Sequence, residues 1–326
     1  MKFCPGLKVI ECYDLPDRTE ENAVYHLLAK NTDEAYYRER TDRNIGWITQ
    51  EEQGMLRKKV IGIAGCGGMG GLLGQILARL GVGEIRICDT EVFDESNINR
   101  QFGATRNTVG LSKALITARK IRETTDDNHL VVYPQGVIPA TVDDFLGGCD
   151  LVCDEIEFWA IGSRILLHQR GRAHSIPIFC CNTIGFGTRL FYFTPVSTTM
   201  EECLGFSPDE AMRLQEKFQS GSASKKEIVR IKDGVVRGLF PELPKYRADG
   251  KDLEKIHGRK LREGKSPIVS TNPPMATGFL ADRILLHLLD KNSTIGRNIT
   301  KMPEMPGYLY FDAAKMEAKV VEGKWW

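Results

Sequence analysis

Short apolar runs alternate with amphipathic stretches through the first half of the chain. Residues 59–64 are almost wholly apolar, which is typical of a strand buried on both faces of a parallel sheet. Residues 72–80 repeat apolar side chains at helical spacing, and residues 84–89 form a second apolar run that ends in Asp89. Strand, glycine-rich turn, helix and strand together predict a βαβ unit of about 30 residues.

The same alternation continues towards the C-terminus. Its further predicted helices are 112–124, 159–173 and 274–289, and its further predicted strands are 130–133, 151–153 and 178–182. Alternating strands and helices predict an α/β fold with a Rossmann-like, doubly wound and mostly parallel sheet. The segments 188–194, 308–312 and 315–321 predict the strands of an antiparallel C-terminal extension.

Two regions differ from this pattern. Residues 1–45 are polar and contain a stretch with helical periodicity at 20–30, so they predict an N-terminal helical arm. Residues 46–326 then form the α/β domain. Within it, residues 197–265 are rich in Lys, Glu, Ser and Gly and predict a polar insertion, helical at 209–218 and otherwise partly mobile.

Composition narrows the class of protein. The chain has 326 residues, of which 42% are hydrophobic and 27% charged, as in ordinary globular proteins. Its 44 Lys and Arg residues balance 43 Asp and Glu residues, so no global charge favours nucleic acid or an anionic membrane. No run approaches the ~20 apolar residues of a membrane span, and the N-terminus has no apolar signal core. We therefore expect a protein that has no membrane segment and is not secreted.

The use of cysteine points to the compartment. Several of the nine cysteines lie inside apolar runs, as in a reducing environment where thiols act as small hydrophobic side chains. Cys180 and Cys181 lie on a predicted buried strand and are expected to belong to the core. Because no Cys-x-x-Cys pair occurs, we expect a cytoplasmic protein without a four-thiolate zinc site.

The chemistry is expected at the turn after the first apolar run. This turn reads Gly-Cys-Gly-Gly-Met-Gly, with glycines at Gly65, Gly67, Gly68 and Gly70. Glycine lets the backbone approach a phosphate closely, and the N-terminus of the following helix carries partial positive charge. Asp89, at the end of the next strand, would bind the ribose hydroxyls of a nucleotide. The alternative is a tight strand–helix turn that binds no ligand.

Two cations follow this turn. Arg100 ends a segment crowded with polar side chains, and Lys113 lies at the start of the next predicted helix. A triphosphate that loses pyrophosphate needs more positive charge around it than a dinucleotide does, so the pair favours ATP. The alternative is that both residues are ordinary surface cations.

Taken in order, these motifs resemble those of the ThiF/MoeB family of ubiquitin-activating-enzyme-like adenylyltransferases. They are Gly-x-Gly-Gly-x-Gly at 65–70, Asp89, Ser-Asn-x-x-Arg-Gln at 96–101 and Gly-x-x-Lys at 110–113. The resemblance covers roughly residues 40–320 and is closest to a bacterial ThiF-like branch. It implies that the protein binds Mg-ATP and that a substrate carboxylate attacks the α-phosphate, which yields an acyl adenylate and pyrophosphate. The carboxylate would belong to a ubiquitin-like protein, a sulfur-carrier protein or a peptide.

The resemblance also implies roles for residues around the turn. Asp89 would hold the ribose, and Gln101 would lie beside the phosphates. The phosphates themselves would be gripped by Asn97, Arg100 and Lys113. Because the substrate carboxylate is the nucleophile, positioning and charge neutralisation would be the main tasks of these side chains.

A further implied role concerns assembly. In the family, an arginine reaches across a dimer interface from a pattern that resembles Arg-Thr-Asp-Arg-Asn-Ile at 40–45. The matching residue is Arg43. The resemblance therefore implies a homodimer in which residues 1–45 make contact with the partner.

The metal position departs from the family pattern. The family's magnesium aspartate aligns with Glu157, and an earlier aspartate aligns with Asp154. A glutamate can bind magnesium, but its carboxylate lies one methylene farther out and the geometry of magnesium is strict. The alternative is that Glu157 caps the helix that follows.

The cysteine pattern departs as well. Many members hold zinc with two Cys-x-x-Cys pairs, but this chain has Met-Glu-Glu-Cys at 200–203, so we expect no zinc. Cys203 remains in a predicted exposed crossover loop, where some members form a thioester. The adjacent Glu201 and Glu202 would raise the pKa of the thiol, which disfavours a reactive thiolate.

Three functions follow from these observations. The leading hypothesis is an ATP-dependent adenylyltransferase of the ThiF type. The second is a catalytically weakened or inactive dimeric module that binds nucleotide or a partner. The third, an NAD-dependent oxidoreductase, rests on the glycine turn and Asp89, and Arg100 and Lys113 speak against it. The activated carboxylate stays open, and a modified nucleoside of tRNA is among the candidates.

Overall fold

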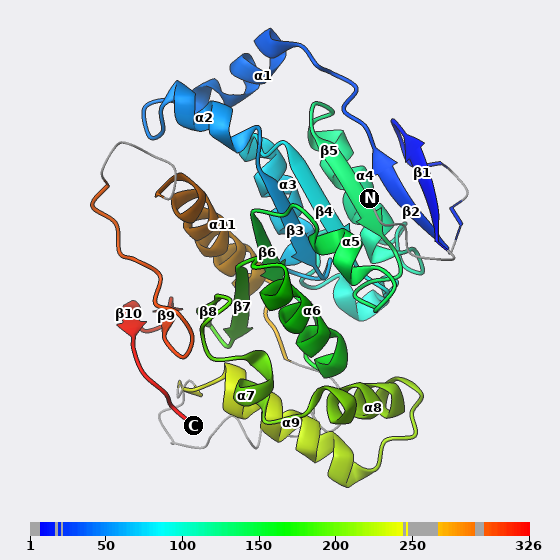
Figure 1. Ribbon diagram of the computed structural model, residues 1–326, viewed down its shortest axis with the longest axis vertical. Helices are drawn as coiled ribbons and strands as arrows, with labels where there is room; N and C mark the ends of the chain where they lie inside the picture. Colours follow the sequence, from blue (N-terminus) through cyan, green and yellow to red (C-terminus); the bar gives the residue numbers. More distant parts are fainter. Residues whose placement is uncertain (1–6, 17–18, 21, 244–245, 247–266, 291–296) are drawn as a thin grey trace. The chain divides into compact units, whose positions relative to one another are not determined.

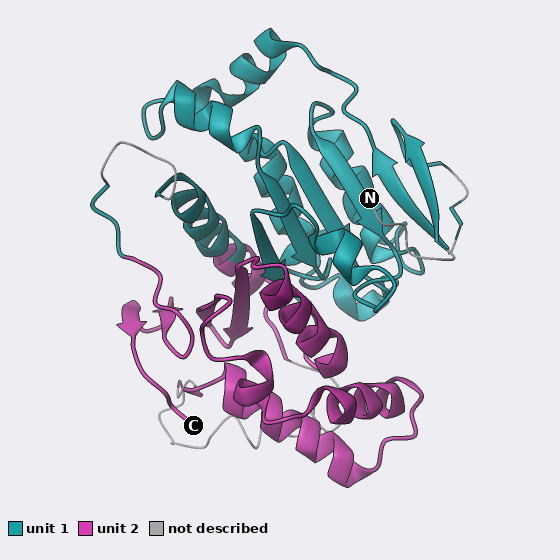
Figure 2. Cartoon of the chain, in the orientation of Figure 1, with its two compact units in different colours: residues 1–155, 277–300 teal, residues 156–276, 301–326 magenta. Residues whose placement is uncertain are grey.

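The computed structural model describes residues 7–16, 19–20, 22–243, 246, 267–290 and 297–326. The chain divides into two compact units, which Figure 2 shows in different colours. Unit 1 consists of residues 1–155 and 277–300, and unit 2 of residues 156–276 and 301–326. Within the described ranges, every helix is too short or too polar to span a membrane.

Unit 1 contains a sheet with a parallel centre (Figure 1). Its strands run in the order β1 (Lys8–Cys12), β2 (Ala23–Leu27), β5 (His129–Tyr133), β4 (Glu84–Cys88), β3 (Val60–Ala64) and β6 (Leu151–Asp154). Strands β5, β4, β3 and β6 are parallel to one another. In β3, Ile61 and Ile63 are fully buried between β4 and β6, which explains why this segment is a continuous apolar run.

Helices connect the strands of unit 1. They are α1 (Glu34–Thr41), α2 (Gln50–Leu56), α3 (Gly70–Leu80), α4 (Lys113–Thr124) and α5 (Val142–Leu146), with 3-10 turns η1 (Asp42–Asn44) and η2 (Glu95–Asn97). Helix α3 packs against α4 and ends at Gly81, whose φ of +95° favours glycine. The apolar helix α11 (Asn272–Asp290) matches the helix predicted at 274–289. These elements confirm the predicted βαβ unit and the Rossmann-like fold.

The predicted helix at 20–30 is wrong. Residues Ala23–Leu27 form strand β2, which pairs antiparallel with β5 and places Tyr25 opposite Val132. Four of the five side chains of β2 are buried, so strand pairing overrides the weak helical periodicity of the segment. No apolar pattern predicts β1, because its side chains are half-buried or exposed. Residues 1–45 are therefore helical only in part.

Unit 2 contains an antiparallel sheet. Its strands are β7 (Ile178–Ile184), β8 (Gly187–Phe193), β9 (Tyr308–Asp312) and β10 (Glu317–Val321), and each pairs antiparallel with the next. This arrangement confirms the predicted antiparallel C-terminal extension. Cys180 and Cys181 of β7 are buried, as predicted.

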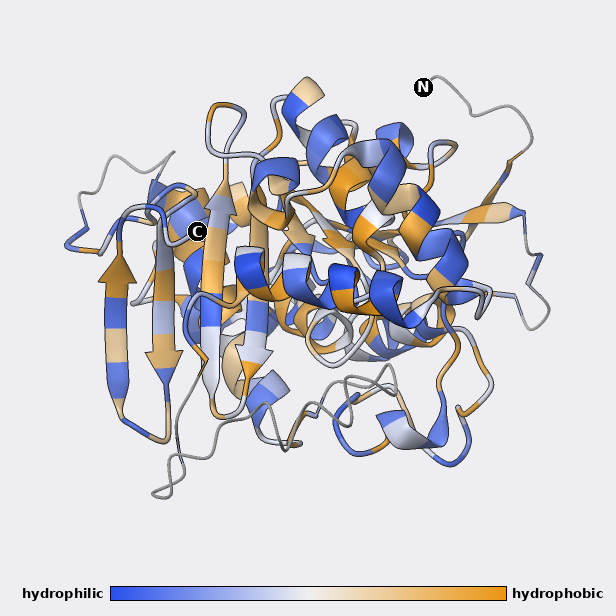
Figure 3. Ribbon diagram, turned by 90° about the horizontal axis from the view of Figure 1, so that it is seen from below, coloured by the Kyte–Doolittle hydropathy of each residue, from blue (hydrophilic) through white to orange (hydrophobic). Residues whose placement is uncertain are grey.

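The polar segment 197–265 is more helical than predicted. After α6 (Ile161–Ala173), its described part forms α7 (Met200–Leu204), α8 (Pro208–Gln219) and α9 (Lys225–Leu239). Helix α9 buries Ile231, Val235 and Leu239 at a spacing of four. The many charged residues between them make this apolar face hard to recognise in the sequence. Figure 3 shows that helices of this protein carry hydrophilic and hydrophobic residues side by side. The predicted mobility of residues 244–245 and 247–265 lies outside the described residues.

Two arginines near the start of unit 1 allow a matched test. Arg40 donates to both carboxylate oxygens of Asp127, at 2.7 and 2.8 Å, and to the carbonyl of Ala78 at 2.9 Å. The side chain of Asp127 is 0% exposed. Arg40→Ala leaves this buried carboxylate without its cation and is expected to lower the free energy of unfolding by about 3 kcal/mol, measured by urea denaturation.

Arg43 provides the control, because it lies exposed in η1. Arg43→Ala is expected to change the free energy of unfolding by less than about 0.5 kcal/mol. Equal losses of stability in the two variants would contradict the assignment of Arg40 as the structural arginine of this segment.

Candidate functional site

The glycine turn between β3 and α3 is so tight that two of its positions require glycine. Gly65 has a φ of +106°, in the left-handed region that favours glycine. A Cβ atom on Gly70 would lie 1.9 Å from the carbonyl oxygen of Gly65. The N–H of Gly65 also donates to the carbonyl of Cys88 at 2.8 Å, which fastens the turn to β4.

Gly67 faces open space in the same turn, next to Gly68. A Cβ atom on Gly67 would have one neighbour within 4 Å in the described part of the chain, the Nε2 atom of Gln101 at 3.8 Å. Met69, the N-cap residue of α3, makes no side-chain hydrogen bond to the first helical turn. The backbone at Gly67 is therefore open to a ligand at the positive end of α3, an arrangement that suits phosphate.

Asp89 follows β4 and lies against this turn. Its Oδ2 accepts a hydrogen bond from the N–H of Cys66 at 2.7 Å, and its Oδ1 accepts one from the N–H of Glu91 at 2.8 Å. Burial raises the pKa of Asp89, while the ammonium of Lys113 and the two N–H groups lower it in part. The carboxylate is held in one orientation, and its remaining lone pairs can accept from a diol such as ribose.

Two amide side chains line the polar segment after Asp89. Asn97 in η2 is buried, and its Oδ1 accepts from the N–H of Asp94 at 3.2 Å. Gln101 is buried beside Gly67, and its Oε1 has no hydrogen-bond partner among the described residues. A buried acceptor without a partner is unfavourable in an empty site, so a ligand that donates to Gln101 would remove this deficit.

Lys113 begins α4 and is held by Glu91, an acid that no sequence motif marks. Lys113 Nζ lies 2.6 Å from Glu91 Oε2, and the side chain of Lys113 is 5% exposed. The backbone N–H of Lys113 also donates to the carbonyl of Glu91 at 2.9 Å. The only signal for Glu91 in the sequence is its place two residues after Asp89.

Arg100 is half-buried at the end of the same segment. Its Nη1 donates to the carbonyl of Ser96 and to Asn99 Oδ1, both at 2.9 Å. Burial lowers the pKa of Arg100, and the carboxylates of Asp94 and Glu91 act against that shift. Arg100 forms no ion pair with any described residue, so its charge is open to an anionic ligand.

No described contact connects Arg43 with this site of its own chain. The predicted role of Arg43 across a dimer interface stays a prediction.

The two predicted metal ligands lie in different settings. Asp154 ends β6, is buried, and is in register with Ala64 at the end of β3. Glu157 is exposed and belongs to unit 2. The alternative role of Glu157 as a helix cap is not supported, because α6 has Ala160 at its N-cap and no side-chain cap. In the part of the chain that the structure describes, no cluster of three His, Cys, Asp or Glu could hold a metal. Magnesium binding stays a prediction.

The expected exposed loop around Cys203 is wrong. Cys203 lies in α7 and is fully buried with Met200 and Leu204, because the short helix turns this face inward. Burial raises the pKa of the thiol, and Glu202 and Glu201 raise it further. A buried thiol with a raised pKa is a poor nucleophile, so the structure gives no support to a catalytic Cys203.

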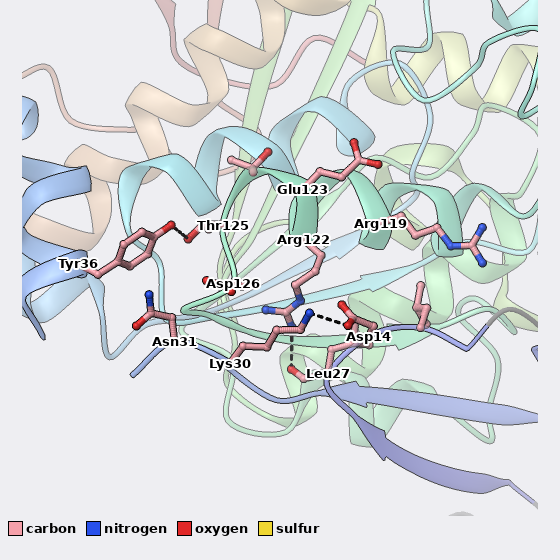
Figure 4. A pocket seen from close by; sticks show the side chains of 12 residues that line it. Asp14, Leu27, Lys30, Asn31, Tyr36, Arg119, Arg122, Glu123, Thr125 and Asp126 are labelled. Atoms are coloured by element: carbon pink, nitrogen blue, oxygen red, sulfur yellow. Dashed lines mark hydrogen bonds and ion pairs between the residues drawn. The ribbon is translucent and has the colours of Figure 1, made fainter. Parts of the chain in front are cut away.

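A separate pocket of about 600 Å³ lies at the C-terminal end of α4. Figure 4 shows its lining side chains, which include Lys30, Arg119 and Arg122. Lys30 is paired with Asp14 at 2.6 Å, and Arg122 donates to the carbonyl of Leu27 at 3.2 Å. Since Lys113 lies at the other end of the same helix, this pocket is distinct from the glycine turn.

The chain is similar to known proteins over much of its length. The sequence model of the ThiF family matches residues 41–323. A tRNA threonylcarbamoyladenosine dehydratase of Escherichia coli is 29% identical over 163 residues, 48% of this chain and 57% of that protein. The adenylyltransferase and sulfurtransferase MOCS3 of Bos taurus is 35% identical over 104 residues, 31% of this chain and 23% of that protein. The matched part of the chain thus spans less than two thirds of these relatives.

Solved structures share the fold at low sequence identity. The structure of PaaA has a TM-score of 0.58 at 16% identity, and covers 90% of this chain and 85% of that chain. The E. coli dehydratase TcdA in complex with ATP has a TM-score of 0.53 at 18% identity, and covers 82% of this chain and 100% of that chain. These likenesses concern the fold, whereas the family model matches the glycine turn and the residues around it. The chain belongs to the ThiF family.

Proposed function

We propose that this protein is an ATP-dependent adenylyltransferase that activates a carboxylate as an acyl adenylate and releases pyrophosphate. The observation that carries the proposal is the open backbone at Gly67, which faces the buried Gln101 side chain. Asp89 and Lys113 lie at the same edge of the parallel strands, each in contact with Glu91. Similar structures include TcdA in complex with ATP or AMP and MccB in complex with ATP, which supports ATP as the ligand.

Each residue of the site has a task in this proposal. Asp89 holds the ribose, and Gln101 accepts a hydrogen bond through Oε1, which no described residue contacts by a hydrogen bond. Asn97 uses Oδ1 within its own loop, so its Nδ2 is the group left for a phosphate oxygen. Arg100 and Lys113 neutralise the triphosphate from two sides of the segment that connects β4 to α4.

The reaction needs no nucleophile from the protein. A carboxylate oxygen of the substrate forms a bond to the α-phosphorus, while the bond from that phosphorus to the bridging oxygen of the β-phosphate breaks. Pyrophosphate leaves with the electron pair of the broken bond. Negative charge grows on the transferred group and the leaving group, and the cations and backbone N–H groups of the site stabilise it.

Of the two predicted magnesium ligands, Asp154 belongs to unit 1, as the glycine turn does, and its side chain is suited to the ion. The carboxylate of Asp154 is a hard oxygen ligand at the end of a parallel strand, where ligands of such sheets bind. Bound there, the ion would screen the triphosphate. Glu157 as a second ligand stays a prediction.

The substrate and the assembly are further parts of the proposal. The C-terminus of a ubiquitin-like or sulfur-carrier protein, a peptide, and a carboxylate on tRNA are the candidate substrates. Relatives include a SAMP-activating enzyme E1 and a tRNA threonylcarbamoyladenosine dehydratase, which supports this range. Arg43 is exposed and Trp47 is 90% exposed, which supports a contact with a second copy of the chain.

A thermal-shift series tests nucleotide binding. We expect the melting temperature to rise with ATP and Mg²⁺, because a ligand at 100 times its Kd stabilises the folded state by about 2.7 kcal/mol. The other arms are ATP with EDTA, AMP, NAD and FAD. A rise with NAD alone would replace the proposal by an oxidoreductase, and a rise with ATP without adenylation of any carboxylate would favour the binding module.

Arg119→Ala is the control variant for this series. Arg119 lines the pocket at the C-terminal end of α4, and no described contact connects its side chain with the glycine turn. The variant is expected to keep the full ATP shift. A lost shift would place the nucleotide in that pocket and contradict the assignment of the glycine turn.

A further inference from the structure

The ion pair between Lys113 and Glu91 is asymmetric. The side chain of Lys113 is 5% exposed, whereas that of Glu91 is 51% exposed, and their charged atoms lie 2.6 Å apart. The backbone of Glu91 is fixed, because its N–H donates to Asp89 Oδ1 and its carbonyl accepts from the N–H of Lys113. The ammonium is therefore held in place, while the carboxylate can leave it by rotation of its own side chain into solvent.

Glu91 is paired with the Lys113 ammonium, which is the positive charge that a phosphate would bind. The carboxylates of Asp89 and Asp94 are also close enough to interact with Lys113. Among the residues that the structure describes, only Glu91 makes a short contact with the ammonium, so it is the direct competitor of an incoming phosphate oxygen. Two anions that compete for one cation oppose each other's binding.

We propose that Glu91 is a displaceable counter-ion, which holds Lys113 in the empty site and is released when nucleotide phosphate binds. This inference rests on the proposed function, because it assumes that Lys113 binds the phosphates. Glu91 then keeps the buried ammonium paired when no nucleotide is present, and it lowers the affinity for ATP. Glu91 is a positioning residue, since it acts through Lys113.

Calorimetric titration of ATP with Mg²⁺ into the full chain tests the proposal. Glu91→Gln is expected to bind ATP about fivefold more tightly than the wild type, because an exposed partner of this kind contributes roughly that factor. Glu91→Asp is the sharper variant, since it keeps the negative charge but withdraws the carboxylate by one methylene from an ammonium that cannot follow. It is also expected to bind ATP more tightly than the wild type.

Glu95→Gln is the matched control. Glu95 is exposed in η2 of the same segment and forms no ion pair with any described residue. Glu95→Gln removes the same charge as Glu91→Gln, but solvent screens an exposed carboxylate, so ATP affinity is expected to stay within about twofold.

A second readout is the acylation of Lys113 by acetic anhydride in the empty protein, which should be faster in Glu91→Gln.

The outcomes separate this inference from the proposed function. A wild type that binds no ATP overturns the proposed function, and the inference falls with it. A wild type that binds ATP while Glu91→Gln binds equally or more weakly overturns the inference alone. Tighter binding by Glu91→Gln with unchanged binding by Glu91→Asp would indicate simple charge repulsion and would also overturn it.

Discussion

Lys113→Ala and Arg100→Ala are each expected to lower adenylation by about 10²- to 10³-fold while the fold stays intact. Both cations would stabilise charge that grows in the transition state, and the loss of one such group has an effect of this size. The fold is expected to tolerate Lys113→Ala, because its partner Glu91 is half-exposed and can be hydrated after the cation is removed. The measurement is release of pyrophosphate from ATP with a panel of carboxylate substrates, beside circular dichroism of each variant.

Lys120→Ala is the matched control on the same helix. Lys120 pairs with Glu123 at the surface, and its removal should leave pyrophosphate release unchanged. Release at the wild-type rate in both Lys113→Ala and Arg100→Ala would contradict the mechanism. Equal losses in Lys120→Ala would instead indicate a general effect of charge on α4.

Gly70→Ala is expected to lower the free energy of unfolding by about 3 kcal/mol. Its new methyl group would lie 1.9 Å from the carbonyl oxygen of Gly65, which is backbone and cannot rotate away. The turn and the start of α3 would have to move apart, as in an overpacked core. Urea denaturation measures this loss, and the melting temperature should fall with it.

Gly67→Ala separates function from folding at the same turn. Among the described residues, a methyl group on Gly67 would meet only Gln101 Nε2, at 3.8 Å, so the melting temperature should stay near that of the wild type. Affinity for ATP should fall at least about tenfold, because the methyl group would occupy the space through which backbone approaches phosphate. Unchanged ATP affinity in a folded Gly67→Ala variant would show that phosphate binds elsewhere.

Much of unit 1 could be predicted because its signals are local. A strand buried on both faces is apolar throughout, and a helix that packs on a sheet repeats apolar residues every three or four positions. Residues 59–64 and 72–80 carry these signals without ambiguity, and the structure places β3 and α3 there. The segment 20–30 carried a weak helical signal, and its pairing with β5, about 100 residues away, decided for a strand.

The part of the candidate site that follows β3 and β4 was predictable, because these strands are close in the sequence and pair with each other. Gly65, Gly70 and Asp89 follow two neighbouring parallel strands, whose carboxyl ends meet at one edge of the sheet. Two features depend on how the loop between β4 and α4 folds back: the pairing of Glu91 with Lys113, and Gln101 Oε1, which has no hydrogen-bond partner among the described residues. Glutamates in such a loop have no sequence pattern that distinguishes a solvated acid from a counter-ion.

Cys203 shows the same limit. A cysteine after two glutamates fits an exposed loop and also the inner face of a short helix, and only packing decided for the helix. The sequence by itself determined the family, the parallel core and the glycine turn, because glycine, apolar period and charge act over a few neighbouring residues. Tertiary structure alone decided which side chains are buried, paired or open to a ligand, because burial depends on contacts between segments far apart in the chain.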